Sequence, residues 1–273
     1  MYRLLATDID DTILAPDGSL PEANRRALEN LHRRGIAVVF SSGRATFSVR
    51  EVAGRIITLA DDEYIIGFNG ARVVTAQSDR VLFQQLLPAE MLREVASYAR
   101  EHDLLVQGYD SEEFIVEKDD PRCEDYSEDT GMEYRVVESI ADALPGGSAK
   151  LLIIDEHENL LGHQKALEKL ADGRWDVTFS KPHYLEIVSP GISKGEALRR
   201  LAEHLGVPIE ETLAVGDSLN DRQMLEAAGL GVAVRNAREE LKAIADVVLE
   251  RTAQEGAIEE LAERFFPGEA GGE

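Results

Sequence analysis

The sequence predicts an α/β fold in which a parallel-sheet core is interrupted by an α+β insertion. At both ends of the 273-residue chain, apolar runs typical of buried strands alternate with amphipathic helical segments. Between residues 81 and 188 this alternation gives way to a looser mixture of strands and helices. Hydrophobic residues make up 44% of the chain, which is enough for a globular core. We therefore expect a discontinuous core domain, residues 1–80 and 189–273, and an inserted domain, residues 81–188.

The N-terminal part of the core is predicted to run strand, helix, strand, helix, in the segments YRLLATDID, SLPEANRRALENLHRRG, IAVVFSSG and TFSVREVAGRI. Ser19 and Glu22 have the spacing of a capping box, and Gly35 stands where a helix C-cap is expected. A further apolar strand precedes FNGARV. Strands joined by helices of this length form parallel sheets with crossover helices.

The C-terminal part repeats this pattern. Helices are expected at SKGEALRRLAEHLG, LNDRQMLEAAG and REELKAIA, and strands at ETLAVGDS, LGVAVRN and DVVLE. We expect these strands to lie beside the N-terminal ones in a single sheet. The final residues, PGEAGGE, are expected to be disordered.

The insertion is expected to form a sheet of its own. Its strand-like segments are VLFQQLL, LLVQGY, EEFIVEK, AKLLIID, WDVTFS and YLEIVS, and its helices are PAEMLREVASYAREH and ENLLGHQKALEKLA. The acidic stretch KDDPRCEDYSEDTG lacks the ligand spacing of a calcium loop, so we expect a solvated loop there.

Charge and composition exclude several classes of partner. The formal net charge is -23, so a general positive field for nucleic acid or anionic lipid is absent. The single cysteine, Cys123, rules out an intramolecular disulfide and fits a reducing compartment. The apolar stretch in MYRLLATDIDD is too short for a signal peptide, and no apolar run has the length of a membrane-spanning helix, so we expect neither feature. We expect a soluble cytoplasmic protein that binds neither nucleic acid nor membrane.

Acidic residues follow two of the predicted strands. Asp8 and Asp10 come just after LLAT, and Asp217 and Asp221 follow the strand in ETLAVGDS. In an open parallel sheet, ligands bind beyond the carboxyl ends of the strands, so these acids should converge. Carboxylate oxygens suit Mg²⁺, which would also offset the repulsion between the acids. The sequence thus predicts a magnesium site at this edge of the sheet.

Residues suited to binding an anion lie between these acids in the chain. Ser42, Gly43 and Arg44 follow the strand IAVVF and offer a hydroxyl, backbone N–H groups and a cation. Ser193 is predicted to cap a helix whose first residue is Lys194, with Glu196 closing a capping box. The Lys194 ammonium could then reach a phosphate held at the strand ends.

This arrangement resembles the haloacid dehalogenase superfamily of phosphohydrolases. DIDDT matches its first motif, the Ser of SSGR its second, Lys194 its third and GDSLND its fourth. The segments FNGARV, VSPGISKGEAL, GDSLNDRQML and VAVRNAREELKAIAD resemble its Cof-type branch. The resemblance implies a Rossmann-like catalytic core and a large α/β cap domain inserted between the second and third motifs.

The resemblance also implies a role for each matching residue. Asp8 is the nucleophile that takes the phosphoryl group, and Asp10, expected to be partly buried, is the general acid and base. Mg²⁺ is bound by Asp8, the backbone carbonyl of Asp10 and Asp217, while Lys194 and Ser42 bind the remaining phosphoryl oxygens.

Four further residues are expected near the phosphate or the metal. Asn220 is expected to hold Lys194 or a phosphate oxygen, and Asp221 to support the metal either as a direct ligand or indirectly. Asn69 and Arg44 are expected to face the cleft under the cap.

Several alternatives remain open at the level of sequence. Asp11 stands where the first motif most often has Gly; we favour a turn residue over an acid that alters metal affinity. A phosphomutase on the same scaffold is the main alternative function, and a receiver-like signalling module is a remote one. The substrate is expected to be a small phosphorylated metabolite, a sugar phosphate by default, with Arg122, Lys181 and His183 as cap residues that could contact it. The oligomeric state stays open.

Overall fold

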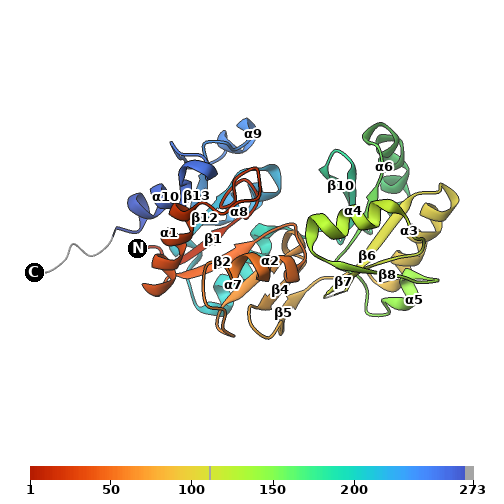
Figure 1. The fold of residues 1–273 in the computed structure, drawn as a ribbon, viewed down its shortest axis with the longest axis horizontal. Helices are drawn as coiled ribbons and strands as arrows, with labels where there is room; N and C mark the ends of the chain where they lie inside the picture. Colours follow the sequence, from red (N-terminus) through yellow and green to blue (C-terminus); the bar gives the residue numbers. More distant parts are fainter. Residues whose placement is uncertain (111, 268–273) are drawn as a thin grey trace, which may run out of the picture. The chain divides into compact units, whose positions relative to one another are not determined.

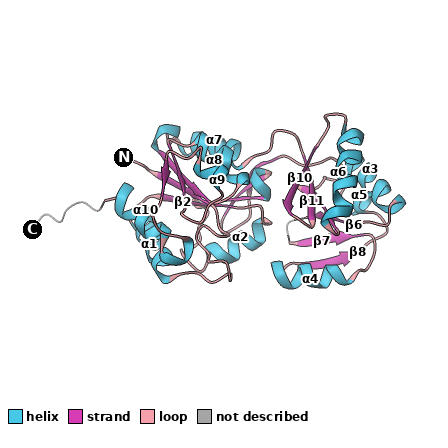
Figure 2. Cartoon of the chain, turned by 90° about the horizontal axis from the view of Figure 1, so that it is seen from above, coloured by secondary structure: helices cyan, strands magenta, loops and turns pink. Residues whose placement is uncertain are grey.

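The computed structural model describes residues 1–110 and 112–267, which divide into two compact units. Unit 1 contains Met1–Gly43, Val49–Leu82 and the described residues from Ser193 onward, and unit 2 contains Arg44–Ser48 and Phe83–Ile192. Each unit has its own sheet with helices beside it (Figure 2). The tail expected to be disordered lies outside the described residues, apart from Pro267.

The described residues form a long sheet built mainly from unit 1. Its strands, in spatial order, are β14 (Val247–Val248), β13 (Leu230–Ala233), β12 (Thr212–Gly216), β1 (Leu4–Thr7), β2 (Ala37–Ser41), β3 (Tyr64–Gly67), β4 (Arg72–Thr75) and β5 (Val81–Gln84). The strands from β14 to β3 are parallel, and β4 pairs with β3 in the antiparallel direction. The predicted α/β fold with a parallel core is confirmed.

Strand β1 lies in the middle of this sheet. It pairs with β2 on one side and with β12 on the other, so that Thr7 is level with Phe40 and with Val215. All four residues of β1 are buried, as expected for a strand covered on both faces. Residues from the two ends of the chain therefore meet at the carboxyl edge of the sheet, as the sequence predicted.

Six α-helices of unit 1 accompany this sheet in the described residues. They are α1 (Glu22–Arg33), α2 (Thr46–Ala53), which begins in unit 2, α7 (Lys194–Leu205), α8 (Arg222–Ala227), α9 (Glu239–Lys242) and α10 (Ala257–Phe265). Helices α1 and α10 pack against each other although they come from opposite ends of the chain (Figure 1). None of the described helices is long and apolar enough to span a membrane.

The start of α1 differs from the prediction. No side chain caps this helix, which begins after Pro21, and the Ser19 hydroxyl donates to Asp17 Oδ1 at 2.6 Å. The prediction of a capping box formed by Ser19 and Glu22 was therefore wrong, because the serine hydroxyl bonds to Asp17 within a local turn. The end of the helix is as predicted, since Gly35 follows it with a φ of 79°.

Unit 2 has a mostly antiparallel sheet. Its strands, in spatial order, are β10 (Asp176–Lys181), β11 (Tyr184–Val188), β9 (Lys150–Ile154), β6 (Leu105–Tyr109), β7 (Glu113–Val116) and β8 (Glu133–Val136). Its helices are α3 (Ala89–Glu101), α4 (Pro121–Thr130), α5 (Ile140–Ala143) and α6 (His157–Ala171). Apolar residues of β9 and β11 pack with residues of α3, α5 and α6 in one hydrophobic core. The predicted α+β insertion with a separate sheet is therefore observed.

The acidic stretch in unit 2 is a helix and not the solvated loop we expected. Asp120 caps α4 by accepting a hydrogen bond from the Arg122 backbone N–H at 3.0 Å, and Pro121 occupies the first turn. Cys123 and Tyr126, three residues apart, are buried on one face of the helix. The prediction failed because the charges obscured this short amphipathic pattern.

Candidate active site

Three of the predicted acids come together at the carboxyl ends of β1 and β12. Asp8 follows β1 directly, and its backbone N–H donates to Val215 O of β12 at 3.0 Å. One carboxylate oxygen from each of Asp8, Asp217 and Asp221 lies within 4.8 Å of the others. The parallel pairing of the two strands thus produces an acidic cluster from residues more than 200 positions apart.

Lys194 holds two of these acids together. Its ammonium is fully buried and donates to Asp8 Oδ1 at 2.5 Å and to Asp221 Oδ1 at 2.7 Å. It is the first residue of α7, whose N-cap Ser193 accepts a hydrogen bond from the Glu196 N–H at 3.0 Å, as predicted. The other half of the predicted capping box is wrong, because the Glu196 carboxylate accepts from its i+4 neighbour Arg200 instead.

Asp221 is folded back under the end of β12. Its second oxygen accepts hydrogen bonds from the backbone N–H groups of Asp217 and Ser218, both at 3.1 Å. This approach requires glycine at position 216, because a Cβ there would lie 2.4 Å from Asp221 Cγ. Both carboxylate oxygens of Asp221 are therefore occupied by protein donors.

The cluster carries more negative than positive charge. Burial and the neighbouring Asp221 raise the pKa of Asp8 well above its ordinary value, although Lys194 acts in the opposite direction. Burial, Asp221 and Asp11 raise the pKa of Asp217 to about 7. Burial alone would lower the pKa of Lys194, but the two acids outweigh it and raise that pKa. Three carboxylates facing one ammonium form a site that a further cation would stabilise, and an oxygen-only donor set fits Mg²⁺.

The chain turns sharply directly after the nucleophile candidate. Ile9 is fully buried, as predicted, whereas Asp10 is exposed and its carboxylate is not part of the acidic cluster. The expectation that Asp10 is partly buried is wrong, because the turn carries it outward while Ile9 takes the core position. Asp11 has a φ of 56°, so the interpretation of Asp11 as a turn residue is confirmed.

Two asparagines that the sequence reasoning missed hold this turn. The Asn236 amide donates to Asp11 O at 2.7 Å and accepts from the Ala253 N–H at 2.9 Å. The amide of Asn24, fully buried in α1, donates to Ile13 O at 3.0 Å and to Ala253 O at 2.8 Å. A sequence signal for Asn24 existed, since it is a polar residue at a core position of an amphipathic helix.

The anion-binding candidates lie along the next strand ends of unit 1. Ser42 is 2% exposed; its N–H donates to Ile66 O and its carbonyl accepts from the Asn69 N–H, both at 3.0 Å. Gly43 lies so close to Asn69 that a Cβ at position 43 would be 3.1 Å from Asn69 Oδ1. Asn69 adopts a left-handed conformation with a φ of 55°. Arg44 belongs to unit 2.

Asn220 has a different partner from the one expected. Its amide donates to Asn69 Oδ1 at 3.1 Å, and its Oδ1 accepts from the Ser218 hydroxyl at 2.6 Å. The ammonium of Lys194, which was one of the two partners expected for Asn220 besides a phosphate oxygen, is bound by Asp8 and Asp221. The expectation was wrong on this partner because a carboxylate is the stronger acceptor for a buried ammonium. The structure instead joins Asn220 to Asn69.

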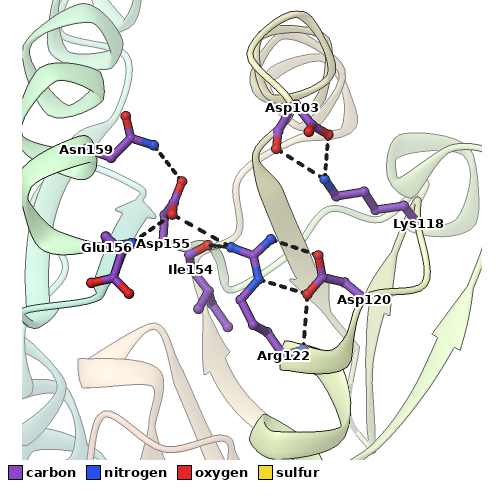
Figure 3. A network of polar contacts seen from close by, with 8 residues as sticks. All are labelled: Asp103, Lys118, Asp120, Arg122, Ile154, Asp155, Glu156 and Asn159. Atoms are coloured by element: carbon purple, nitrogen blue, oxygen red, sulfur yellow. Dashed lines mark hydrogen bonds and ion pairs between the residues drawn. The ribbon is translucent and has the colours of Figure 1, made fainter.

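Arg122, which we considered as a cap residue for substrate, is engaged within unit 2. Its guanidinium donates to both Asp120 oxygens, at 2.8 and 2.7 Å, and to Ile154 O at 2.6 Å (Figure 3). Asp155 lies 3.9 Å from the same guanidinium (Figure 3). This network ties the start of α4 to the end of β9, which gives Arg122 a structural role.

Comparison with known proteins identifies the family. The sequence model of the haloacid dehalogenase-like hydrolase family matches residues 5–261. The chain belongs to this family. It is 31% identical over 244 residues to HMP-PP phosphatase of Cronobacter sakazakii, covering 89% of this chain and 88% of that protein. It is also 32% identical over 272 residues to phosphatase YwpJ of Bacillus subtilis, with coverages of 90% and 94%.

Solved structures agree with this assignment. A haloacid dehalogenase-like hydrolase from Bacteroides thetaiotaomicron superposes with a TM-score of 0.90 at 29% identity, covering 97% of this chain and 99% of the other. The Cof-type resemblance of the sequence is therefore confirmed, and this haloacid dehalogenase-like hydrolase is a phosphoric monoester hydrolase.

Proposed function

We propose that this phosphatase is Mg²⁺-dependent and hydrolyses a small phosphorylated metabolite through an aspartyl-phosphate on Asp8. The observation that carries the proposal is the buried Lys194 ammonium between Asp8 and Asp221, with Asp217 in the same cluster. A carboxylate attacks a phosphorus atom only where the phosphoryl charge is neutralised. Lys194 and a bound cation would provide that neutralisation beside Asp8.

In the first step, a carboxylate oxygen of Asp8 attacks the phosphorus in line with the leaving oxygen. The P–O bond to the leaving group breaks, and Asp10 as a carboxylic acid gives that oxygen its proton. In the second step, the Asp10 carboxylate takes a proton from water, whose oxygen attacks the phosphorus and releases Asp8. The exposed position of Asp10, two residues after Asp8, supports its exchange of protons with substrate and water.

The acids present fit a divalent cation. Asp8, Asp217 and the backbone carbonyl of Asp10 would hold Mg²⁺, which when bound supplies positive charge next to the phosphoryl oxygens. Asp221 would hold Lys194 and the end of β12 through its two occupied oxygens. We assign phosphate binding to Lys194 together with the groups on the neighbouring strand ends, namely Ser42, Gly43, Arg44, Asn69 and Asn220.

The decisive experiment follows p-nitrophenyl phosphate hydrolysis with Mg²⁺ and with EDTA. Asp8→Asn should lose about 10³-fold or more in kcat, since the nucleophile is removed, while the surface variant Asp17→Asn should match wild type. Brief exposure to ³²P-labelled substrate followed by acid quenching should label wild type on a hydroxylamine-sensitive bond. Equal, slow hydrolysis by wild type and Asp8→Asn would refute the proposal.

The substrate is proposed from the relatives and the family. HMP-PP, named in one group of relatives, and sugar phosphates are the compounds to test. Ranking wild-type kcat/KM over a panel that contains HMP-PP, ribose 5-phosphate, glucose 6-phosphate and p-nitrophenyl phosphate would identify the preferred class. A preference for large phosphorylated proteins over every small compound would contradict the proposal.

A further inference from the structure

Unit 1 contains a pocket that the proposed chemistry does not use. It has a volume of about 520 Å³ and is lined by residues from the last turns of α1 and from the segment that follows α2, residues 54–59. This volume is within the range of about 300–1,000 Å³ that is typical of sites for small molecules. All the residues that line the pocket belong to unit 1.

The pocket lies at the edge of the sheet opposite to the acidic cluster. Helix α1 ends at Arg33, shortly before β2 begins at Ala37, and residues 54–59 precede β3, which begins at Tyr64. The pocket is therefore beside the amino ends of β2 and β3, whereas the acidic cluster lies at the carboxyl ends of β1 and β12. A ligand in this pocket is out of reach of Asp8.

Two arginines that line the pocket have no counter-charge. The guanidinium groups of Arg33 and Arg55 form no hydrogen bond or ion pair with residues 1–110 and 112–267. By contrast Arg25 and Arg26, on the same helix as Arg33, both donate to Glu22, at 2.8 and 2.7 Å. The chain has 52 aspartates and glutamates against 29 lysines and arginines, so an acidic partner is easily found. The absence of a described partner for both arginines is therefore informative.

The other charged residues of the pocket are already paired. Glu29 accepts a hydrogen bond from Arg25 at 3.1 Å, and His32 lies 3.3 Å from Glu63. The two free guanidinium groups are thus an excess of positive charge.

The ordinary explanation for these arginines covers each one but not both together. A cation near a helix C-terminus is common, because it interacts favourably with the helix dipole. This accounts for Arg33 at the end of α1 or for Arg55 beyond the end of α2, taken singly. It does not account for the convergence of both on one pocket.

Further donors and an apolar floor complete the pocket. The hydroxyl and the backbone N–H of Thr58 donate to no residue in the described part of the chain. Ile56 and Ile57, which are 4% and 6% exposed, line the pocket on the side of the protein interior. Low-dielectric walls strengthen the field in a cleft lined by one sign of charge and concentrate counter-ions there.

We propose that this pocket binds a small oxyanion with a charge of about −2, carried by a phosphate group or by a dicarboxylate. Arginine presents planar pairs of N–H groups that match the oxygens of phosphate and carboxylate. The two guanidinium groups balance the charge of such an anion, and Thr58 adds a hydroxyl donor. The anion is bound and not hydrolysed, because the acidic cluster lies at the other edge of the sheet.

Calorimetric titration of the EDTA-treated protein with inorganic phosphate, and separately with malonate, tests the site. Without a divalent cation the acidic cluster repels anions, so binding reports on the pocket. Wild type should bind at least one of the two anions in a saturable manner. The Kd should rise about tenfold or more in Arg33→Gln and in Arg55→Gln, because each variant loses charge-assisted hydrogen bonds to the anion.

Arg199→Gln is the matched control. Arg199 is another exposed arginine of unit 1 with no partner among the described residues, but it lies on α7 and does not line the pocket. Its Kd should stay within about twofold of wild type, because a distant exposed charge is screened by salt.

The two anions distinguish the possible ligands. Binding of phosphate alone would assign the pocket to a phosphate group, binding of malonate alone would assign it to a dicarboxylate, and binding of both would show that either dianion is accepted. Binding of neither anion, or a Kd that is unchanged in both pocket variants, would overturn the inference.

Chemical modification gives a second measurement on the unmutated protein. Phenylglyoxal reacts with accessible arginines, and mass spectrometry after digestion gives the rate at each position. The anion that binds should slow the modification of Arg33 and Arg55 and leave that of Arg199 unchanged. Equal rates with and without the anion would overturn the inference even if titration detects binding. Neither measurement involves hydrolysis, so this inference and the proposed phosphatase mechanism can fail independently.

Discussion

The two units each bury a lysine among acids, but the balance of charge differs. In unit 1 a single ammonium, Lys194, faces Asp8, Asp217 and Asp221. In unit 2 Lys150 faces one carboxylate, Glu186, which keeps one oxygen without a partner among the described residues. The excess of negative charge in the unit 1 cluster favours binding of a further cation, whereas the Lys150–Glu186 pair is neutral overall. The same residue types thus form a cluster with net negative charge in one unit and a neutral buried pair in the other.

Removing each lysine should expose this difference most strongly. Lys194→Met leaves three buried acids with no cation, so we expect a loss of about 3–5 kcal/mol in the free energy of unfolding and no measurable turnover. Lys150→Met leaves one acid, which can take up a proton, so its loss should be smaller. Urea unfolding measures both, and Mg²⁺ should restore stability to Lys194→Met only. Equal recovery of both variants by Mg²⁺ would remove the distinction between the units.

The pH dependence of stability should come from the acidic cluster. The pKa of Asp217 is about 7 in the folded protein, above the value of about 3.9 in an unfolded chain. Folding therefore favours the protonated carboxyl, and its stabilising contribution is lost as pH rises from about 4 to 7. Without divalent cations, Tm should fall over this range more steeply in wild type than in Asp217→Asn, and Mg²⁺ at neutral pH should reverse the fall. Parallel Tm profiles of the two proteins would contradict this reasoning.

Replacing the whole ion pair of unit 2 by apolar residues should leave stability unchanged or raise it. Buried pairs replaced by apolar residues of similar size often leave stability unchanged or raise it by about 1–4 kcal/mol. We expect the double variant Lys150→Met/Glu186→Leu to have a Tm equal to or above that of wild type. A strongly destabilised double variant would assign the pair to folding.

Asp11→Gly should have the smallest effect. Asp11 borders the acidic cluster but has a φ of 56°, a conformation that glycine adopts without strain. We expect the free energy of unfolding to change by less than about 1 kcal/mol and kcat/KM by less than twofold. Asp11→Val, with a branched side chain at the same φ, should be clearly less stable. Loss of turnover in a folded Asp11→Gly would show that this acid belongs to the catalytic cluster after all.

The sequence was sufficient to predict which acidic residues lie at the carboxyl ends of the central strands. Buried strands ending in Asp8 and in Asp217 are visible as apolar runs followed by acids, and parallel pairing then brings them together. Lys194 was predictable because its helix begins with a recognisable cap, Ser193. These local patterns each have one structural solution, so the fold and the acidic cluster followed from them.

The sequence failed where a polar side chain has several possible partners. Ser19 could cap a helix or close a turn, and Asn220 could bind Lys194 or Asn69; only the tertiary structure selects among these. Asn24 reaches Ala253, 229 residues away, which no local pattern shows. The buried Glu186 oxygen that has no partner among the described residues likewise becomes apparent only when every neighbouring donor is placed.

The pairing of β1 with β12 also determines when activity can arise during synthesis. Asp8 and Lys194 are 186 residues apart, which at a translation rate of about 5–20 residues per second is a delay of roughly 10–40 s. During that time the nascent β1 can pair with β2, while its other edge stays unpaired until β12 has been synthesised. The continuous stretch Phe83–Ile192 of unit 2 emerges within the same interval and can fold first. The nascent chain therefore carries Asp8, the proposed nucleophile, before Lys194 and Asp217 exist to complete the acidic cluster, and we expect activity to arise in one late step.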